Sequence, residues 1–233
     1  MEFPTVFEWI QRLEFLRGLP AAYLALLSAL IVIVLWDWRV TVLALALQYL
    51  AVGLLYIDVL DPRLAIVKVL VGWFICLMLY FTARQINGGR PPQDAKREGA
   101  VHAPRDRRIR LGPLSLPSNA PFRVFVGLMV ALVALTIAGR PGFRLPAASE
   151  AMNVAIFGLG SLGLVGLGLT TEPLQAGMGL LLFMSGFQLY YNSLEQSVAM
   201  LVFLAVGDLV LTLAIAYLTQ SHHSLTAAIR QGG

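Results

Sequence analysis

The apolar residues of this chain come in runs of about 20, and this feature constrains its fold more than any other. A helix of about 20 residues crosses roughly 30 Å of hydrocarbon. Of the 233 residues, 58% are hydrophobic and only 13% are charged, too small a charged share for the surface of a soluble domain. We therefore expect an all-α, polytopic membrane protein with about seven transmembrane helices. They are predicted at residues 21–36, 40–57, 64–82, 122–138, 151–169, 174–192 and 197–218.

Residues 84–121 differ in kind from these spans. They are rich in Arg, Gly and Pro and show no hydrophobic periodicity, which is typical of a solvated linker. The linker would join an N-terminal three-helix unit, residues 20–83, to a C-terminal four-helix unit, residues 122–219. Its eight basic and three acidic residues favour the cytoplasm. We expect a cell (inner) membrane protein with its N-terminus outside and its C-terminus, with a tail at residues 220–233, in the cytoplasm.

The N-terminal segment has a third kind of pattern. Residues 1–19 carry Phe7, Ile10 and Leu13 at helical spacing, with charged and polar residues between them. This pattern predicts a short amphipathic helix lying at the membrane interface.

Two charged residues lie well inside predicted spans. Asp208 is near the middle of the last one, where a charged residue costs about 2.5–3.5 kcal/mol on insertion scales. Its short side chain must either stay neutral or be held ionised by a partner, and both states suit a carrier of protons or cations. The alternative is a hydrogen-bonded contact between helices, with Thr212 one turn away. Lys68 is nearer the outer end of the third span and could instead extend to the headgroups.

A polar stripe runs along the sixth predicted span. Ser185, Gln188, Asn192 and Glu195 recur at helical spacing, so they share one face. Lipid disfavours such a face, which should therefore contact protein or a hydrated path. A stripe that only joins helices is the alternative.

Glycines recur along the fifth predicted span. Gly160, Gly163 and Gly166 lie roughly along one face, where another helix could approach closely. Plain tight packing is the simplest interpretation of this pattern.

The sequence offers little for metal or redox chemistry. The one cysteine, Cys76, cannot form a disulfide within the chain, and no Cys/His cluster could bind zinc. His102, His222 and His223 lie outside the spans, so no intramembrane pair could hold haem. We expect no metal, no cofactor and no covalent catalysis by this chain alone.

The last three spans, residues 151–219, resemble a known family. The segments "GFQL", residues 186–189, and "VGDLVLTLAI", residues 206–215, are similar to the second and third helices of subunit K of respiratory complex I and of its relatives in cation/proton antiporters. In that family both helices carry a carboxylate. The second corresponds to Asp208 and the first to Gln188, and glutamine cannot exchange a proton near neutral pH. The resemblance implies that one relay carboxylate is lost here or is supplied by another subunit.

The front half is similar to a narrower family. The stretch "RVTVLALALQYLAVGLLYIDVLDPRLAIVKVLVGWFICLMLYFTARQI" resembles the N-terminal part of membrane component E of energy-converting nickel–iron hydrogenases, the formate-hydrogenlyase type, with a lysine at the position of Lys68. This implies a non-catalytic membrane-arm subunit of a proton- or sodium-translocating oxidoreductase complex, with antiporter-like subunits as partners and redox cofactors in other chains. The implied ion path has Asp208 as its proton carrier and Lys68 as a coupling charge. Its hydrogen-bonding section would comprise Gln188, Asn192 and Ser185.

Two other functions stay open. The chain could be a structural membrane subunit whose buried polar groups only fix helix packing. A stand-alone enzyme or transporter is disfavoured, because neither a catalytic constellation nor an internal repeat is visible in the sequence.

Overall fold

The structure is a computed structural model that describes residues 14–88, 109–111, 114–116, 120–145 and 148–231. Within this part the chain forms seven α-helices and little else. The helices are α2 (Leu19–Val34), α3 (Trp38–Tyr56), α4 (Pro62–Gly88), α6 (Ala120–Ala138), α7 (Glu150–Gly168), α8 (Pro173–Leu194) and α9 (Val198–Gln231). The remaining elements are the 3-10 helices η1 (Glu14–Leu16) and η2 (Pro141–Phe143) and the strands β1 (Ile109–Leu111) and β2 (Leu114–Leu116).

Five of these helices, α3, α4, α6, α7 and α9, are long and apolar enough to cross a membrane. The protein is therefore a helical, multi-pass membrane protein, as its composition predicts. The apolar α2 has only 16 residues. The 22-residue α8 is long enough, but it carries the polar stripe. The expected total of seven spans stays a prediction.

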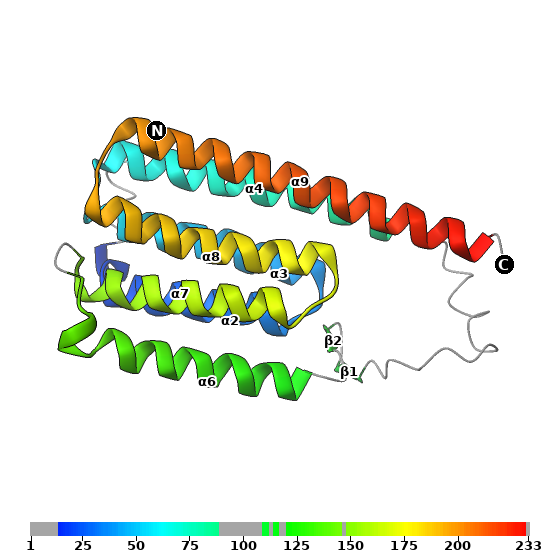
Figure 1. Cartoon of the computed structure of the whole chain (residues 1–233), viewed down its shortest axis with the longest axis horizontal. Helices are drawn as coiled ribbons and strands as arrows, with labels where there is room; N and C mark the ends of the chain where they lie inside the picture. The colour runs from blue at the N-terminus through cyan, green and yellow to red at the C-terminus, as the bar shows by residue number, and fades with distance from the viewer. Residues whose placement is uncertain (1–13, 89–108, 112–113, 117–119, 146–147, 232–233) are drawn as a thin grey trace, which may run out of the picture.

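The bundle repeats one three-helix arrangement (Figure 1). Helices α2, α3 and α4 run antiparallel to one another in turn, and α7, α8 and α9 do the same. Each helix packs on its counterpart: α2 on α7, α3 on α8 and α4 on α9. The two units therefore lie one over the other as two layers, in the same helix order. Helix α6 stands outside both units and packs against α7 and α2.

Glycines bring α7 and α8 into backbone contact. A Cβ on Gly163 would lie 2.3 Å from the backbone nitrogen of Phe183, and one on Gly179 would lie 2.7 Å from that of Leu167. On Gly160, by contrast, a Cβ would meet nothing within 4 Å. The close-packing interpretation of the glycine pattern thus holds for Gly163, and the Cβ position of Gly160 is open.

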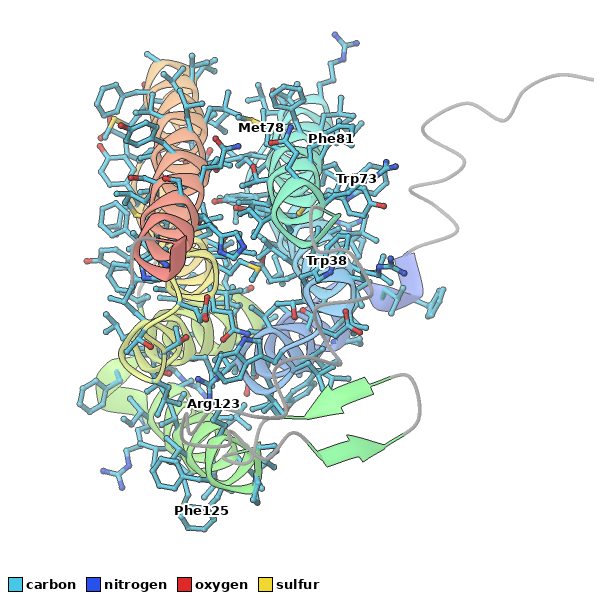
Figure 2. All side chains as sticks on the ribbon, turned by 90° about the vertical axis from the view of Figure 1, so that its right-hand side faces the viewer. Trp38, Trp73, Met78, Phe81, Arg123 and Phe125 are labelled. Atoms are coloured by element: carbon cyan, nitrogen blue, oxygen red, sulfur yellow. The ribbon has the colours of Figure 1, made fainter. Side chains whose placement is uncertain are left out.

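The outer helices present apolar faces outward. In the most apolar stretch of each helix, the share of residues that are buried is 33% for α4, 22% for α6 and 28% for α9. The corresponding shares are 61% for α3 and 56% for α7. Trp73 and Phe81 of α4 and Phe125 of α6 are exposed on these faces (Figure 2). Such surfaces suit lipid or partner helices.

Two helices extend past their predicted ends. Helix α4 continues to Gly88 instead of ending near residue 82, and α9 continues to Gln231 instead of giving way to a tail at 220. Residues 219–231 contain neither Gly nor Pro, so nothing in them interrupts a helix. The Gln220 side-chain amide donates to the Gln85 side-chain oxygen at 3.0 Å, joining the two extensions.

The predicted linker and N-terminal segment also need correction. A short antiparallel hairpin lies inside the linker, with Ile109 opposite Leu116 and Leu111 opposite Leu114. In both segments apolar and polar residues alternate, the period of a strand. Most of the predicted interfacial helix, residues 1–13, lies outside the described residues. Its last part forms the 3-10 helix η1 instead, and Arg17 is paired with Asp58 of the α3–α4 connection at 2.7 Å.

Candidate functional site

The two charges predicted inside the spans lie next to each other. Lys68 is on the second turn of α4 and Asp208 is on α9, and these helices run side by side in the same direction (Figure 1). The Lys68 ammonium nitrogen is 3.6 Å from Asp208 Oδ2, and the two side chains are 7% and 5% exposed. One interpretation of its position was that Lys68 extends to the headgroups. The buried ion pair shows that it does not.

Gln188 of α8 bridges this pair. Its Nε2 donates to Asp208 Oδ1 at 2.8 Å, and its Oε1 accepts a hydrogen bond from the Lys68 ammonium. The amide thus offers its donor to the carboxylate and its acceptor to the cation, the orientation that stabilises both charges. We call Lys68, Gln188 and Asp208 the buried cluster.

Thr212 does not bind the Asp208 carboxylate. Its hydroxyl donates to the backbone carbonyl of Asp208 at 2.7 Å, a common bond within a helix. The suggested contact between these side chains is therefore absent, and the carboxylate oxygens are left to Gln188 and Lys68.

A small cavity of about 10 Å³ adjoins the cluster, roughly the space that one water needs. Ser185 lines it, but the Ser185 hydroxyl donates to the Leu181 carbonyl in its own helix at 2.9 Å rather than to the cluster. The full lining comprises Tyr49, Val52, Gly53, Tyr56, Lys68, Val71, Gly72, Ser185, Gln188 and Asp208.

Glycines bring the wall of this cavity close to α4. A Cβ on Gly72 would lie 2.4 Å from Cγ of Tyr49, so the tyrosine ring packs where a side chain would otherwise stand. A Cβ on Gly53 would lie 2.1 Å from a methyl group of Val69. The absence of side chains at these two positions lets α3 approach α4 beside Lys68.

Asn192 continues the polar stripe toward the end where α3 and α8 terminate. Its Nδ2 donates to the Gln188 carbonyl at 2.8 Å and to the Tyr56 hydroxyl at 3.2 Å. Both Asn192 and Tyr56 are almost completely buried. Among the described residues, Asn192 Oδ1 has no hydrogen-bond partner, which leaves one acceptor free beside the cluster.

Sequence reasoning missed Tyr49 and Tyr56. Tyrosines are common near the ends of membrane helices, so neither stands out in an apolar run. The available signal was their position on α3, since Tyr49, Val52 and Tyr56 recur at helical spacing.

Arg123 is a second buried basic residue, at the edge of a predicted span, to which the sequence pattern assigned no role. It is 5% exposed. Its guanidinium donates to the Leu169 carbonyl at 2.7 Å, to the Ile33 carbonyl at 3.4 Å and to Gln175 Oε1 at 3.3 Å. It also lies over the Trp36 ring, 4.6 Å from the centroid. The negative C-terminal ends of α2 and α7 thus both contact one cation from α6. Figure 2 shows the place of Arg123 in the bundle.

Arg123→Lys is expected to lower the free energy of unfolding by about 1–3 kcal/mol, because one ammonium cannot span both carbonyls and a buried acceptor is left unpaired. Thermal unfolding of the purified protein in detergent measures this. The exposed Arg63→Lys is the control, expected within about 0.5 kcal/mol of the unmodified protein. Equal effects of the two changes would contradict the assigned contacts.

Lys68→Met is expected to destabilise the protein by about 3–5 kcal/mol, because it leaves the Asp208 carboxylate buried without its cation. The double change Lys68→Met with Asp208→Leu removes both charges and should recover most of that loss. Unfolding equilibria in detergent test this coupling, with Arg63→Met as the control on the same helix. A double variant that is as unstable as the sum of the single variants would show that the two charges do not interact.

The comparisons with known proteins add nothing to this geometry: no protein family, curated protein or solved structure matches the sequence. What the site can do must be argued from its own residues.

Proposed function

We propose that this protein is a membrane-arm subunit of a proton- or sodium-translocating assembly of the hydrogenase or complex-I-like type, and that Asp208 carries the ion through it. The observation that carries the proposal is the buried cluster, in which a lysine and an aspartate from two membrane-spanning helices meet at 3.6 Å. Charged residues inside a bilayer are costly and usually serve function. The resemblance to subunit K and to component E supports the same conclusion.

The chemistry follows from the charge of the cluster. With Lys68 and Asp208 both ionised, the cluster has no net charge. A proton on Asp208 removes the negative charge and leaves the Lys68 ammonium without its partner. At low dielectric this change in interaction is several times larger than in water. Occupancy of Asp208 therefore controls the position of Lys68, and α4 and α9 would transmit that change.

Gln188 has a different part in this mechanism. Its amide cannot take up a proton near neutral pH, but it holds Asp208 and Lys68 in register through one bond to each. In our proposal it is a positioning residue, and a second relay carboxylate, if the assembly needs one, comes from a partner subunit.

Buried polar groups continue from the cluster in both directions. Asn192 and Tyr56 extend the polar stripe to the last turns of α8 and α3. Toward the other end, the buried polar residues Gln48 and Thr212 lie among apolar residues such as Ile75.

A structural subunit is the second candidate function, and one observation favours it. The hydrogen bonds of Gln188 and Asp208 are satisfied within the bundle, and the adjoining cavity of about 10 Å³ is far from a continuous water path. Under this alternative the cluster only fixes the packing of α4, α8 and α9. Asp208→Leu would then weaken assembly, and Asp208→Asn would be almost silent.

The proposal is tested by tagging the C-terminus, solubilising the membrane gently and identifying what co-purifies. We expect large antiporter-like membrane subunits together with hydrogenase-like or complex-I-like redox subunits. The purified assembly, placed in vesicles and supplied with its reductant, should take up or expel protons. A chain that purifies alone, with unchanged stability, would overturn the assignment as a subunit.

A further inference from the structure

We propose that the outward groove between α6 and α7 binds one acyl chain of an anionic phospholipid, whose phosphate is held by Arg140 and Arg144. This site lies on the opposite side of the bundle from α4 and α9 and does not depend on the function proposed for the buried cluster (Figure 1).

The groove is apolar and has a volume of about 230 Å³. The one hydroxyl in its lining, that of Ser161, donates to the Phe157 carbonyl of its own helix at 2.7 Å, so its proton is not available to a ligand. The groove therefore suits a hydrocarbon chain. Its lining comprises Met129, Val130, Val133, Ala134 and Ile137 of α6 with Phe157 and Ser161 of α7.

The length of the groove favours a lipid tail over a partner helix. From Met129 to Ile137 it follows α6 for about 12 Å, close to half of the roughly 30 Å hydrocarbon core. That is the depth of one leaflet. A partner helix would need a groove across the whole span, but the other half of α6 presents Phe122, Phe125 and Leu128 outward.

Two arginines stand at the end of the groove nearest the membrane surface. Arg140 and Arg144 flank η2 and are both exposed. Among the described residues, neither forms an ion pair. Unpaired guanidinium groups at the membrane boundary bind phosphate diesters through paired hydrogen bonds.

The arginine segment is fixed against the groove. Phe143 lies between the two arginines. Its ring packs edge-on against the groove-lining Phe157 ring, with 6.4 Å between the ring centroids. The Asn153 amide donates to the Ala138 carbonyl at 3.0 Å and to the Phe143 carbonyl at 3.4 Å. Headgroup site and tail site are thus parts of one structure.

The test measures lipid binding to the full-length purified protein by native mass spectrometry, with phosphatidylglycerol and phosphatidylcholine of identical tails. We expect phosphatidylglycerol to bind at least about tenfold more tightly. The double change Arg140→Gln with Arg144→Gln should abolish this preference. Arg63→Gln is the control, since it removes an exposed arginine at the same end of the bundle, on α4. Val133→Trp, which fills the groove, should weaken binding of both lipids.

Three results would overturn the proposal. They are equal binding of the two lipids, a preference that survives loss of both arginines, and unchanged lipid binding by the Val133→Trp variant. If Val133→Trp instead releases a co-purifying membrane subunit while lipid binding is unchanged, the groove docks a partner helix. Circular dichroism of every variant separates these outcomes from loss of folding.

Discussion

Asp208→Asn is expected to leave the assembly intact and to reduce ion translocation to the background level of vesicles without reductant. Asparagine has the shape of aspartate, and its side-chain oxygen can still accept the hydrogen bond from Gln188 Nε2. It cannot ionise, so it can neither release a proton nor attract a cation. The Lys68 ammonium would retain Gln188 Oε1 as a hydrogen-bond acceptor. The bundle should therefore stay folded, with lower stability because the Lys68 ammonium is buried without its anion, and proton uptake and release at this position should stop.

The measurement compares proton movement per turnover in vesicles, reported by a pH-sensitive dye, with the redox rate of the same preparation. Asp61→Asn is the matched control, because it removes an exposed carboxylate just before α4. Full translocation by the Asp208→Asn variant, together with assembly defects in an Asp208→Leu variant, would support the structural role instead. Loss of assembly in the Asp208→Asn variant itself would show that the negative charge is required for packing.

Gly163→Ala is expected to have a large effect on stability, lowering the free energy of unfolding by about 3 kcal/mol. The added Cβ would lie 2.3 Å from the Phe183 nitrogen and 2.8 Å from the Gly179 carbonyl oxygen. Both are backbone atoms, so no side chain can rotate away and the helices α7 and α8 must separate. Since α8 carries Gln188, this separation would also disturb the buried cluster.

Gly160→Ala is the control on the same helix, because a Cβ there meets nothing within 4 Å. It should be neutral or stabilising by up to about 1 kcal/mol, since alanine favours the helix. Equilibrium unfolding in detergent, followed by circular dichroism, compares the two variants. If both lose stability equally, the α7–α8 contact is looser than the distances indicate.

Much of the fold could be predicted because hydropathy and helix interruption are local properties. The apolar runs mark the helices to within a few residues, since a span needs length and apolar side chains whatever its neighbours are. The paired strands β1 and β2 and the long ends of α4 and α9 were missed. Their composition is polar or mixed, and hydropathy carries little information in such segments.

The candidate site, too, could be predicted from the sequence only in part. From the sequence alone, Asp208, Lys68 and Gln188 stand out as costly polar groups in apolar helices, because the bilayer penalises them wherever they are. Only the tertiary structure decides that Lys68 bonds Gln188 and Asp208, which are 120 and more residues away in the chain. The same holds for the burial of Arg123 by the ends of α2 and α7, and for the repetition of one three-helix arrangement by two dissimilar sequences. These contacts depend on which helix faces fit together, and that is set by side-chain packing between distant segments rather than by any local pattern.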